Sequence, residues 1–256
     1  MLNRPFCGQS AKMVLATDLD GTFLGGDPAH RALLYDWLRA RDDVQLIFVT
    51  GRDPDFIATL CASGEVPAPD FVIGDVGTTI ARFHQGRVQP LADLEAPIAA
   101  AWRGLTDEVQ ARLAPINGLW LQKSPFRHRL SYEYDSRFDR ADLTVLDELA
   151  VDLIVSHGCF VDVLPRGVSK GPSLTRLIAH LGLDADRVLV AGDTLNDLSM
   201  FETGLHGARV GGSEPDLLAA PAHLPRAHRC RHIGAVGIIE AIHAHALHPT
   251  PTELPL

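Results

Sequence analysis

Two pairs of carboxylates each follow an apolar segment, one near the start of the chain and one far downstream. Asp18 and Asp20 belong to the first pair, and Asp193 and Asp197 to the second. Acidic side chains at the ends of two strands suit a hard, oxygen-preferring cation beside a carboxylate nucleophile. Asp193 directly follows its apolar segment, so it is the better metal ligand of the second pair. We therefore predict a phosphate-transfer site.

The first pair has a spacing that suits covalent chemistry. A phosphoryl group is anionic, so an attacking carboxylate needs a cation to offset the repulsion. We expect Asp18, at the strand tip, to attack phosphorus and form an aspartyl-phosphate. Strand residues two apart share a face, so Asp20 is expected beside Asp18, where it protonates the leaving oxygen and then activates water. Thr22, after the turn at Gly21, offers a hydroxyl to the phosphate.

Further residues offer donors for phosphate oxygens. Thr50 ends another apolar run and precedes Gly51 and Arg52, which predicts a hydroxyl and a loop N–H facing the phosphate. Lys170 begins an amphipathic helical segment, where its charge opposes the helix dipole but suits an anion. The short motif at 18–21 is also compatible with a strand followed by an acidic turn. The later motifs favour the chemical interpretation.

These residues need a scaffold that brings strand ends together. Apolar runs such as 44–49 and 188–191 alternate with amphipathic segments, and Asp27-Pro28 is typical of a helix start. Such alternation predicts an α/β fold, a doubly wound parallel sheet of Rossmann-like type with its site at the carboxyl edge. We assign residues 1–80 and 165–256 to this core domain.

Residues 81–164 have a different pattern and are predicted to form an inserted α+β cap domain that acts as a lid. Trp120 is expected in the core of this cap. The charged stretch from Arg127 to Arg129 suits either a solvated strand end or a sugar-binding face of the lid. The expected elements are a hairpin around 85–86, one long helix over 98–113, a strand over 130–134, helical spacing over 143–149 and a second hairpin over 151–164.

Composition limits the expected partners. The 256 residues include 23 Lys and Arg against 32 Asp and Glu, which gives a net charge of −9. No basic stripe is present, so nucleic acid is not an expected partner. No segment approaches the length of a membrane span, and no signal-peptide core is present. We therefore expect a cytoplasmic monomer or weak homodimer that acts on a small phosphorylated sugar and does not bind a membrane.

Sulfur and imidazole side chains give no metal motif by spacing. The cysteines lack paired spacing and are expected to be free thiols in a reducing compartment: Cys7, Cys61, Cys159 and Cys230. Six histidines crowd the C-terminal part at irregular intervals: His223, His228, His232, His243, His245 and His248. We predict no metal site there, because no cysteine or acid completes one, and expect these histidines to be solvated.

The motifs resemble, in order, those of the haloacid dehalogenase superfamily of aspartate-nucleophile phosphatases: Asp18-Leu19-Asp20-Gly21-Thr22, Thr50-Gly51-Arg52, Lys170 and the run 192–197. The resemblance implies that Asp18 is the nucleophile and Asp20 the acid/base. It implies that Thr50 and Lys170 bind phosphate. The Mg²⁺ ligands that it implies are the Asp18 carboxylate, the Asp20 backbone carbonyl and Asp193, with Asn196 and Asp197 in support.

The insertion lies between the second and third motifs, which resembles the larger cap class of that superfamily. Within this class the chain resembles sucrose-phosphate and mannosylfructose-phosphate phosphatases, over the segments 69–78, 130–132, 161–165 and 169–171. The resemblance implies Mg²⁺-dependent hydrolysis of a phosphorylated disaccharide or similar glycoside, with Arg129 and Tyr132 on the sugar. Thr79 and Arg129 stand where a Glu and a Lys are usual, and Arg binds as a fork where Lys is a point charge.

Other activities stay open at this point. The same fold suits a mannosyl- or glucosyl-3-phosphoglycerate phosphatase, a broad sugar-phosphate phosphatase, or a phosphosugar mutase whose lid retains a phosphorylated intermediate. A catalytically silent binding module is disfavoured, because such a module has no chemical need for Asp18, Asp20, Lys170 and Asp193 together.

Overall fold

A computed structural model describes residues 11–219 and 226–249. Cys7 and His223 lie outside the described residues. The larger part of the molecule is a sheet of eight strands in the order β12-β11-β10-β1-β2-β3-β4-β5. Its strands are β1 (Met13–Thr17), β2 (Val44–Val49), β3 (Phe71–Gly74), β4 (Thr79–His84), β5 (Arg87–Pro90), β10 (Val188–Gly192), β11 (His206–Gly211) and β12 (Ala227–Ile233).

Helices cover both faces of this sheet, as a doubly wound fold requires. Along β1, Met13 and Leu15 point into one hydrophobic cluster and Val14 and Ala16 into the other, because strand side chains alternate. Helices α1 (Pro28–Arg39), α2 (Pro54–Ala62) and α8 (Gly234–Ala244) pack on the first face. Helices α5 (Lys170–Leu181), α6 (Leu198–Phe201) and α7 (Pro215–Ala219) pack on the second. The predicted α/β core is confirmed.

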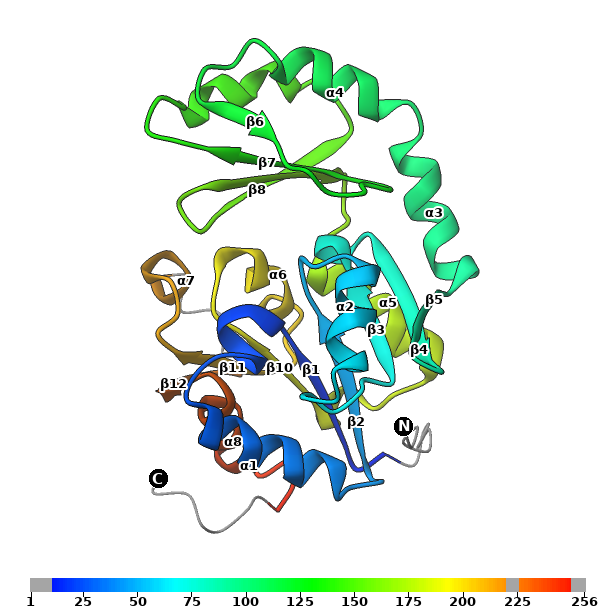
Figure 1. Ribbon diagram of the computed structural model, residues 1–256, viewed down its shortest axis with the longest axis vertical. Coiled ribbons are helices and arrows are strands. Elements are labelled where there is room, and N and C mark those ends of the chain that lie inside the picture. Colours follow the sequence, from blue (N-terminus) through cyan, green and yellow to red (C-terminus); the bar gives the residue numbers. More distant parts are fainter. Residues whose placement is uncertain (1–10, 220–225, 250–256) are drawn as a thin grey trace.

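A second sheet forms a cap over the carboxyl ends of the parallel strands (Figure 1). Its strand order is β6-β7-β9-β8, all antiparallel: β6 (Leu119–Leu121), β7 (Leu130–Tyr134), β8 (Val151–Ser156) and β9 (Phe160–Pro165). Helices α3 (Ala92–Trp102) and α4 (Leu105–Leu113) and the 3-10 turn η4 (Arg140–Leu146) belong to the same part of the chain. We call residues 92–165 the cap. Its own hydrophobic cluster includes Trp102, Val109 and Leu143.

The structure corrects three details of the predicted insertion. The hairpin around 85–86 is β4–β5, which pairs antiparallel onto β3 of the core sheet, so the predicted boundary at 81 falls inside a core strand. The expected long helix is two helices, since Gly104 adopts the left-handed conformation (φ +80°) at the start of α4. The helical spacing at 143–149 belongs in part to a 3-10 turn. The hairpin over 151–164 forms as predicted.

Short irregular turns connect the core strands to their helices. The turn η2 (Leu19–Phe23) follows β1, η3 (Asp75–Gly77) follows β3, η5 (Ala185–Arg187) precedes β10, and η6 (Leu195–Asp197) follows it. Three of them, η2, η3 and η6, follow the carboxyl ends of core strands and therefore lie on the side that faces the cap. Within the described ranges, no helix is both long and apolar enough to cross a membrane.

Candidate active site

The carboxylates of three aspartates meet at the carboxyl edge of the central strands. β1 lies between β10 and β2, and the backbone N–H of Asp18 continues the ladder by donating to the Ala191 carbonyl at 2.8 Å. One carboxylate oxygen each from Asp18, Asp193 and Asp197 lies within 4.8 Å of the others. The predicted convergence of the two acidic motifs is therefore present, and it results from the parallel pairing of β1 with β10.

Lys170 is the cation of this cluster. It is the first residue of α5 and its side chain is fully buried. The ammonium donates to Asp18 at 2.7 Å, to Asp197 at 2.6 Å and to the side-chain oxygen of Asn196 at 2.7 Å, which uses all three donors. Burial alone would lower the pKa of Lys170, but the charges of Asp18 and Asp197 outweigh it and raise the pKa. Lys170 is therefore a fixed positive charge beside the predicted nucleophile.

Asp197 has both oxygens engaged by the protein. One accepts from Lys170, and the other accepts from the backbone N–H groups of Asp193 at 2.9 Å and Thr194 at 3.0 Å. The side chain thus positions Lys170 and the loop after β10. Its predicted part as a supporting group fits this geometry, and one of its oxygens also belongs to the three-carboxylate cluster.

The charge balance at Asp18 and Asp193 suits a divalent cation. Burial raises the pKa of Asp193 to about 7, with a contribution from Asp197. Burial also raises the pKa of Asp18, although the charge of Lys170 opposes it. Two desolvated carboxylates held together fit the oxygen donor set of Mg²⁺. Thr22, predicted to bind phosphate, instead donates to Asp193 at 2.7 Å and so orients this carboxylate.

Asp20 lines the same cavity as Asp18 and occupies a more exposed position. The chain leaves the strand after Thr17, and Gly21 adopts φ +78°, so the two-residue strand repeat does not extend to Asp20. Its carboxylate accepts two hydrogen bonds from Arg52, at 2.8 and 2.9 Å. Nearly half of each side chain is exposed, 44% for Asp20 and 48% for Arg52. Arg52 therefore contacts the predicted acid/base as well as the pocket.

A cavity of about 230 Å³ separates these core residues from the cap. The core contributes Asp18, Asp20, Gly51, Arg52, Val76, Thr194 and Asn196. The cap contributes Gln122, Arg129, Ser131, Ser156, His157, Phe160 and Asp162. Thr50 is fully buried below this cavity, where its hydroxyl accepts from the backbone N–H of Arg52 at 3.2 Å. The cap wall is thus mainly polar, which suits a ligand rich in hydroxyl groups.

Arg129 lines the cavity, but its guanidinium is already paired with acidic and carbonyl groups of the protein. Its guanidinium pairs with Asp75 of the core at 3.2 Å and Asp162 of the cap at 3.4 Å, and it donates to the Gly51 carbonyl at 3.0 Å. It also contacts Ser131. The side chain is 5% exposed. Arg129 therefore joins cap to core next to the cavity, a role that its predicted contact with the sugar did not include.

Tyr132 and Trp120 lie elsewhere than predicted, and Arg127 has an acidic partner within the cap. Tyr132 packs into the hydrophobic cluster of the cap with 4% of its surface exposed, and burial raises its pKa to about 12. The prediction that it contacts sugar is wrong, because the alternation along β7 turns Ser131, not Tyr132, toward the cavity. Trp120 is 44% exposed and donates to Glu133 instead of filling the cap core. Arg127 pairs with Glu95 at 2.7 Å.

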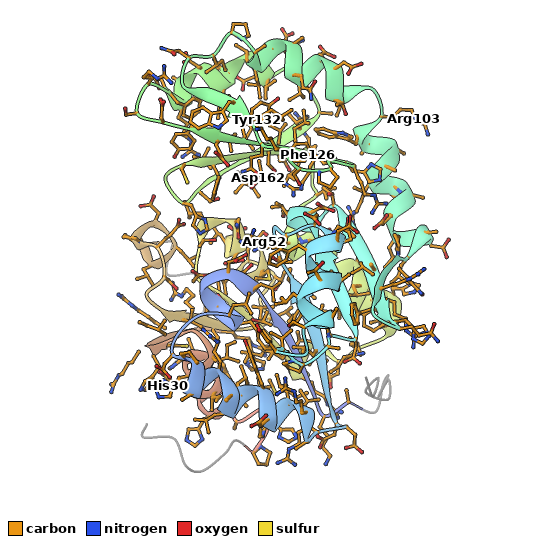
Figure 2. All side chains as sticks on the ribbon, viewed as in Figure 1. His30, Arg52, Arg103, Phe126, Tyr132 and Asp162 are labelled. Atoms are coloured by element: carbon orange, nitrogen blue, oxygen red, sulfur yellow. The ribbon has the colours of Figure 1, made fainter. Side chains whose placement is uncertain are left out.

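Apart from Arg129, the polar residues of the cap wall were not predicted as site residues from the sequence. Asp162 stands between two buried valines on β9 and is 6% exposed, and it accepts a hydrogen bond from Ser131 of β7. In Figure 2 Asp162 lies between Tyr132 of the cap and Arg52 of the core. An acid at a fully buried strand position was the available signal, since such a group needs a partner. Its neighbour across the sheet could not be read from the sequence.

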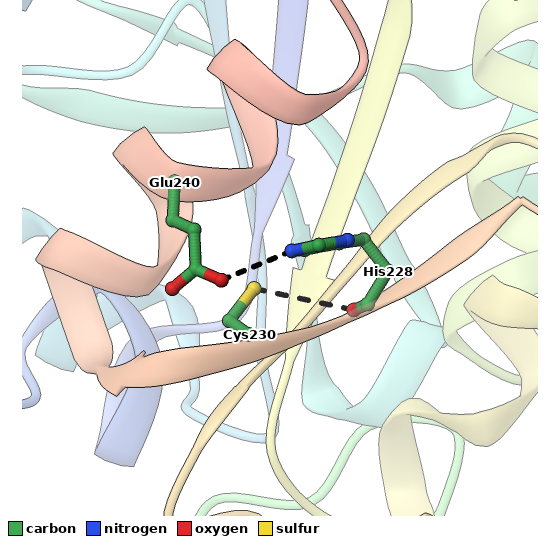
Figure 3. A group of neighbouring side chains, drawn as sticks. All are labelled: His228, Cys230 and Glu240. Atoms are coloured by element: carbon green, nitrogen blue, oxygen red, sulfur yellow. Dashed lines mark hydrogen bonds and ion pairs between the residues drawn. The ribbon is translucent and has the colours of Figure 1, made fainter. Parts of the chain in front are cut away.

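Several of the histidines near the C-terminus are not simply solvated, contrary to prediction, whereas His243 is exposed as expected. His228 and Cys230 occupy alternate positions of β12 and face Glu240 of α8, with ligand-type atoms of the three within 4.8 Å (Figure 3). The carboxylate of Glu240 accepts from the rings of His228 at 3.0 Å and His232 at 2.8 Å, and also from the backbone N–H of Arg231. The acid that seemed to be missing is thus present, and its oxygens already join β12 to α8.

A family model and two known proteins match this chain over most of its length. The family model of sucrose-6F-phosphate phosphohydrolase matches residues 11–246. A mannosylfructose-phosphate phosphatase of Agrobacterium fabrum is 30% identical over 248 residues, covering 92% of this chain and 98% of that protein. A glucosylglycerol-phosphate synthase of Pseudomonas anguilliseptica is 42% identical over 231 residues, covering 90% of this chain. The chain spans only 30% of the length of that synthase.

A solved structure supports the same relationship. The sucrose-phosphatase of Synechocystis sp. PCC6803, determined in complex with sucrose and phosphate, superposes with a TM-score of 0.80 and 27% identity. The match covers 92% of this chain and 98% of that one. A sugar phosphatase of haloacid dehalogenase subclass IIB has a TM-score of 0.61 at 16% identity, a likeness of fold alone.

Proposed function

The chain belongs to the sucrose-6F-phosphate phosphohydrolase family of haloacid dehalogenase phosphatases, and we propose that it releases phosphate from a small phosphorylated glycoside through an aspartyl-phosphate on Asp18. The observation that carries the proposal is the contact of the buried Lys170 with Asp18 directly beneath a polar cap cavity. A carboxylate held by a fixed cation at a strand tip is suited to attack an anionic phosphoryl group.

The residues of the chain account for each step. An oxygen of Asp18 bonds to phosphorus while the bond from phosphorus to the sugar oxygen breaks. Asp20, once protonated, gives its proton to the departing sugar oxygen and then takes one from the water that hydrolyses the aspartyl-phosphate. Because Arg52 now holds Asp20, the incoming phosphate must draw Arg52 away before Asp20 acts. Asp18 and Asp193 would hold Mg²⁺, which offsets the charge of the phosphate oxygens.

Removal of the metal is expected to abolish activity. EDTA treatment should remove phosphatase turnover, Mg²⁺ should restore it, and Ca²⁺ should inhibit, because its longer bonds and higher coordination number draw Asp18 out of line for attack. Phosphate release from p-nitrophenyl phosphate after EDTA treatment and dialysis measures this. Full turnover by the metal-free protein would contradict the assignment.

The affinity for Mg²⁺ is expected to depend on pH. Since the pKa of Asp193 is raised to about 7, its carboxylate is free above that pH and holds a proton below it. A proton competes with the cation, so the apparent Kd for Mg²⁺ should rise about tenfold or more per unit as the pH falls below about 7, and level off above. Calorimetric titration of metal-free protein with Mg²⁺ measures the slope. A Kd that does not change with pH would contradict the raised pKa.

The substrate that we favour is a hexose joined to a polyol or to a second sugar and carrying one phosphate. Sucrose-phosphatase and mannosylfructose-phosphate phosphatase are named for substrates of this kind. The resemblance to part of a glucosylglycerol-phosphate synthase favours glucosylglycerol phosphate specifically. That synthase is named for a phosphate ester of a small glycoside, and this chain matches 30% of its length.

A screen of phosphate release tests the substrate class. The panel contains glucosylglycerol phosphate, sucrose 6F-phosphate, mannosylfructose phosphate, glucosyl- and mannosyl-3-phosphoglycerate, and hexose monophosphates. We expect kcat/KM for one glycoside phosphate to exceed that for every hexose phosphate by about tenfold or more, because the cap wall then contributes binding energy. Equal values would favour a broad sugar phosphatase. Conversion of one hexose phosphate to an isomer without phosphate release would indicate a mutase.

Ser156 and Tyr132 form a matched pair for testing the cap wall. Ser156 lines the cavity and is 3% exposed, and its hydroxyl, like that of Tyr132, has no hydrogen-bond partner among the residues that the structure describes. We expect a sugar hydroxyl to form a hydrogen bond with Ser156, because Ser156, unlike Tyr132, lines the cavity, so Ser156→Ala should lower kcat/KM for the preferred glycoside phosphate about three- to tenfold. Tyr132→Phe should change it less than about twofold, since Tyr132 faces the cap core. The reverse order would contradict the assigned faces of β7 and β8.

A further inference from the structure

One glutamate bonds to the cap and to the catalytic loop at the same time. Glu214 lies between β11 and α7 in the core. One of its carboxylate oxygens accepts from the backbone N–H of His157 in the cap at 2.7 Å. The other accepts from the backbone N–H of Leu195 in the core at 2.8 Å. We propose that Glu214 is a positioning residue that couples closure of the cap to the loop carrying Asp193.

The cap side of this bridge is the turn between β8 and β9. His157 (φ +54°) and Gly158 (φ +60°) both adopt the left-handed conformation in the three-residue loop between Ser156 and Phe160, and the N–H of Cys159 closes the turn on the Ser156 carbonyl. The N–H of His157 points out of this ladder and is available to Glu214. Ser156 and Phe160, at the two ends of the turn, line the cavity. A turn held by Glu214 therefore holds two residues of the cap wall.

The core side of the bridge is the loop that follows β10. Besides receiving the Leu195 N–H, Glu214 donates its own N–H to the Asp193 carbonyl at 2.8 Å. Glu214 thus forms hydrogen bonds with two residues of this loop, Asp193 and Leu195. Asp193 is the proposed metal ligand, and Asn196, one residue beyond Leu195, contacts Lys170. Movement of the cap turn is therefore linked through Glu214 to the residues around the nucleophile.

A glutamate is suited to this position for two reasons. Each oxygen serves a donor on a different part of the molecule, whereas glutamine has only one acceptor oxygen on its side chain. Both donors are backbone N–H groups, so the bridge needs the closed position of the cap and no particular cap side chain. Arg129 makes a buried crossing from the cap to the core, to Asp75 and to the Gly51 carbonyl. Arg129 and Glu214 thus fasten the cap to two different catalytic loops.

The test compares Glu214→Gln with Glu202→Gln, which removes the same charge from an exposed position after α6. The inference rests on the proposed function, so two substrates are used: the glycoside phosphate of the screen that wild type hydrolyses fastest, and p-nitrophenyl phosphate. For Glu214→Gln we expect kcat/KM to fall about tenfold or more on the glycoside phosphate and less than about threefold on p-nitrophenyl phosphate. The small substrate gives the cap little to bind and has a leaving group that needs no protonation.

Asp197 still holds the N–H groups of Asp193 and Thr194 in this variant, so the loop itself should persist. A second readout does not depend on activity. In small-angle scattering with Mg²⁺ and orthophosphate, Glu214→Gln should have a larger radius of gyration than wild type and Glu202→Gln, because its cap opens more often. Glu214→Ala, which removes both acceptors, should show the larger effect in both measurements.

The outcomes separate this inference from the proposed function. Equal losses on both substrates would mean that Glu214 serves only the loop, and unchanged kinetics would mean that its bond to the cap has no effect; either result overturns the coupling. An unchanged radius of gyration also overturns it. If wild type fails to prefer any glycoside phosphate, the proposed function fails, and the scattering comparison still decides whether Glu214 holds the cap closed.

Discussion

Asp18→Asn is expected to lower kcat by about 10⁴-fold or more, which corresponds to about 5.5 kcal/mol of lost transition-state stabilisation. The amide nitrogen cannot act as the nucleophile, and the change removes one anionic oxygen from the proposed metal site. Because asparagine has nearly the same shape, the strand β1 and its ladder to β10 should persist. Phosphate release from p-nitrophenyl phosphate and from the best glycoside phosphate measures the loss. Far-ultraviolet circular dichroism checks the fold.

Asp20→Asn is the matched control for covalent chemistry. It should reduce turnover by roughly 10²–10⁴-fold, because it removes proton transfer without removing the nucleophile. After acid quenching with labelled substrate, phosphate should remain bound to Asp20→Asn and be absent from Asp18→Asn. Residual activity of Asp18→Asn within about tenfold of wild type would show that another group attacks phosphorus.

The core of the fold and of the site could be predicted because both follow from local patterns. Apolar runs that end in Asp18 and Asp193 define adjacent parallel strands, and parallel strands bring their carboxyl ends to one edge. Lys170 could be placed because it begins a helix with a clear apolar stripe. The contacts with Asp18 and Asp197 then follow from where the strand ends and the helix start meet.

The cap was predicted less well because its pattern does not reveal its partners. The alternation along 130–134 predicts a strand, but it does not show which face of the strand packs into the hydrophobic core of the cap. The prediction that Tyr132, and not Ser131, faces the ligand was therefore wrong. The sequence pattern of the hairpin β4–β5 is the same whether the hairpin pairs with the cap sheet or with the core sheet, to which it belongs.

Lys170→Ala is expected to damage both stability and activity. The substitution leaves Asp18 and Asp197, which are 5% and 0% exposed, without their buried counter-ion. Breaking a buried ion pair in this way should lower the free energy of unfolding by about 3–5 kcal/mol. Turnover of both the glycoside phosphate and p-nitrophenyl phosphate should be lost, because both carry the phosphate. Urea unfolding and phosphate release measure the two effects. Lys12→Ala, at a surface pair with Asp43, should change stability by less than about 1 kcal/mol.

The pH dependence distinguishes lost charge from lost packing in Lys170→Ala. Burial already raises the pKa of Asp18, and without Lys170 the pKa should rise further. An acid whose pKa is higher in the folded than in the unfolded protein costs stability as the pH rises between those two values. The deficit of Lys170→Ala relative to wild type should therefore be smaller at acidic pH than at neutral pH. Mg²⁺ should reduce it at the higher pH by supplying positive charge. A deficit that is the same at both pH values and insensitive to Mg²⁺ would mean that Lys170 stabilises the site mainly by filling space.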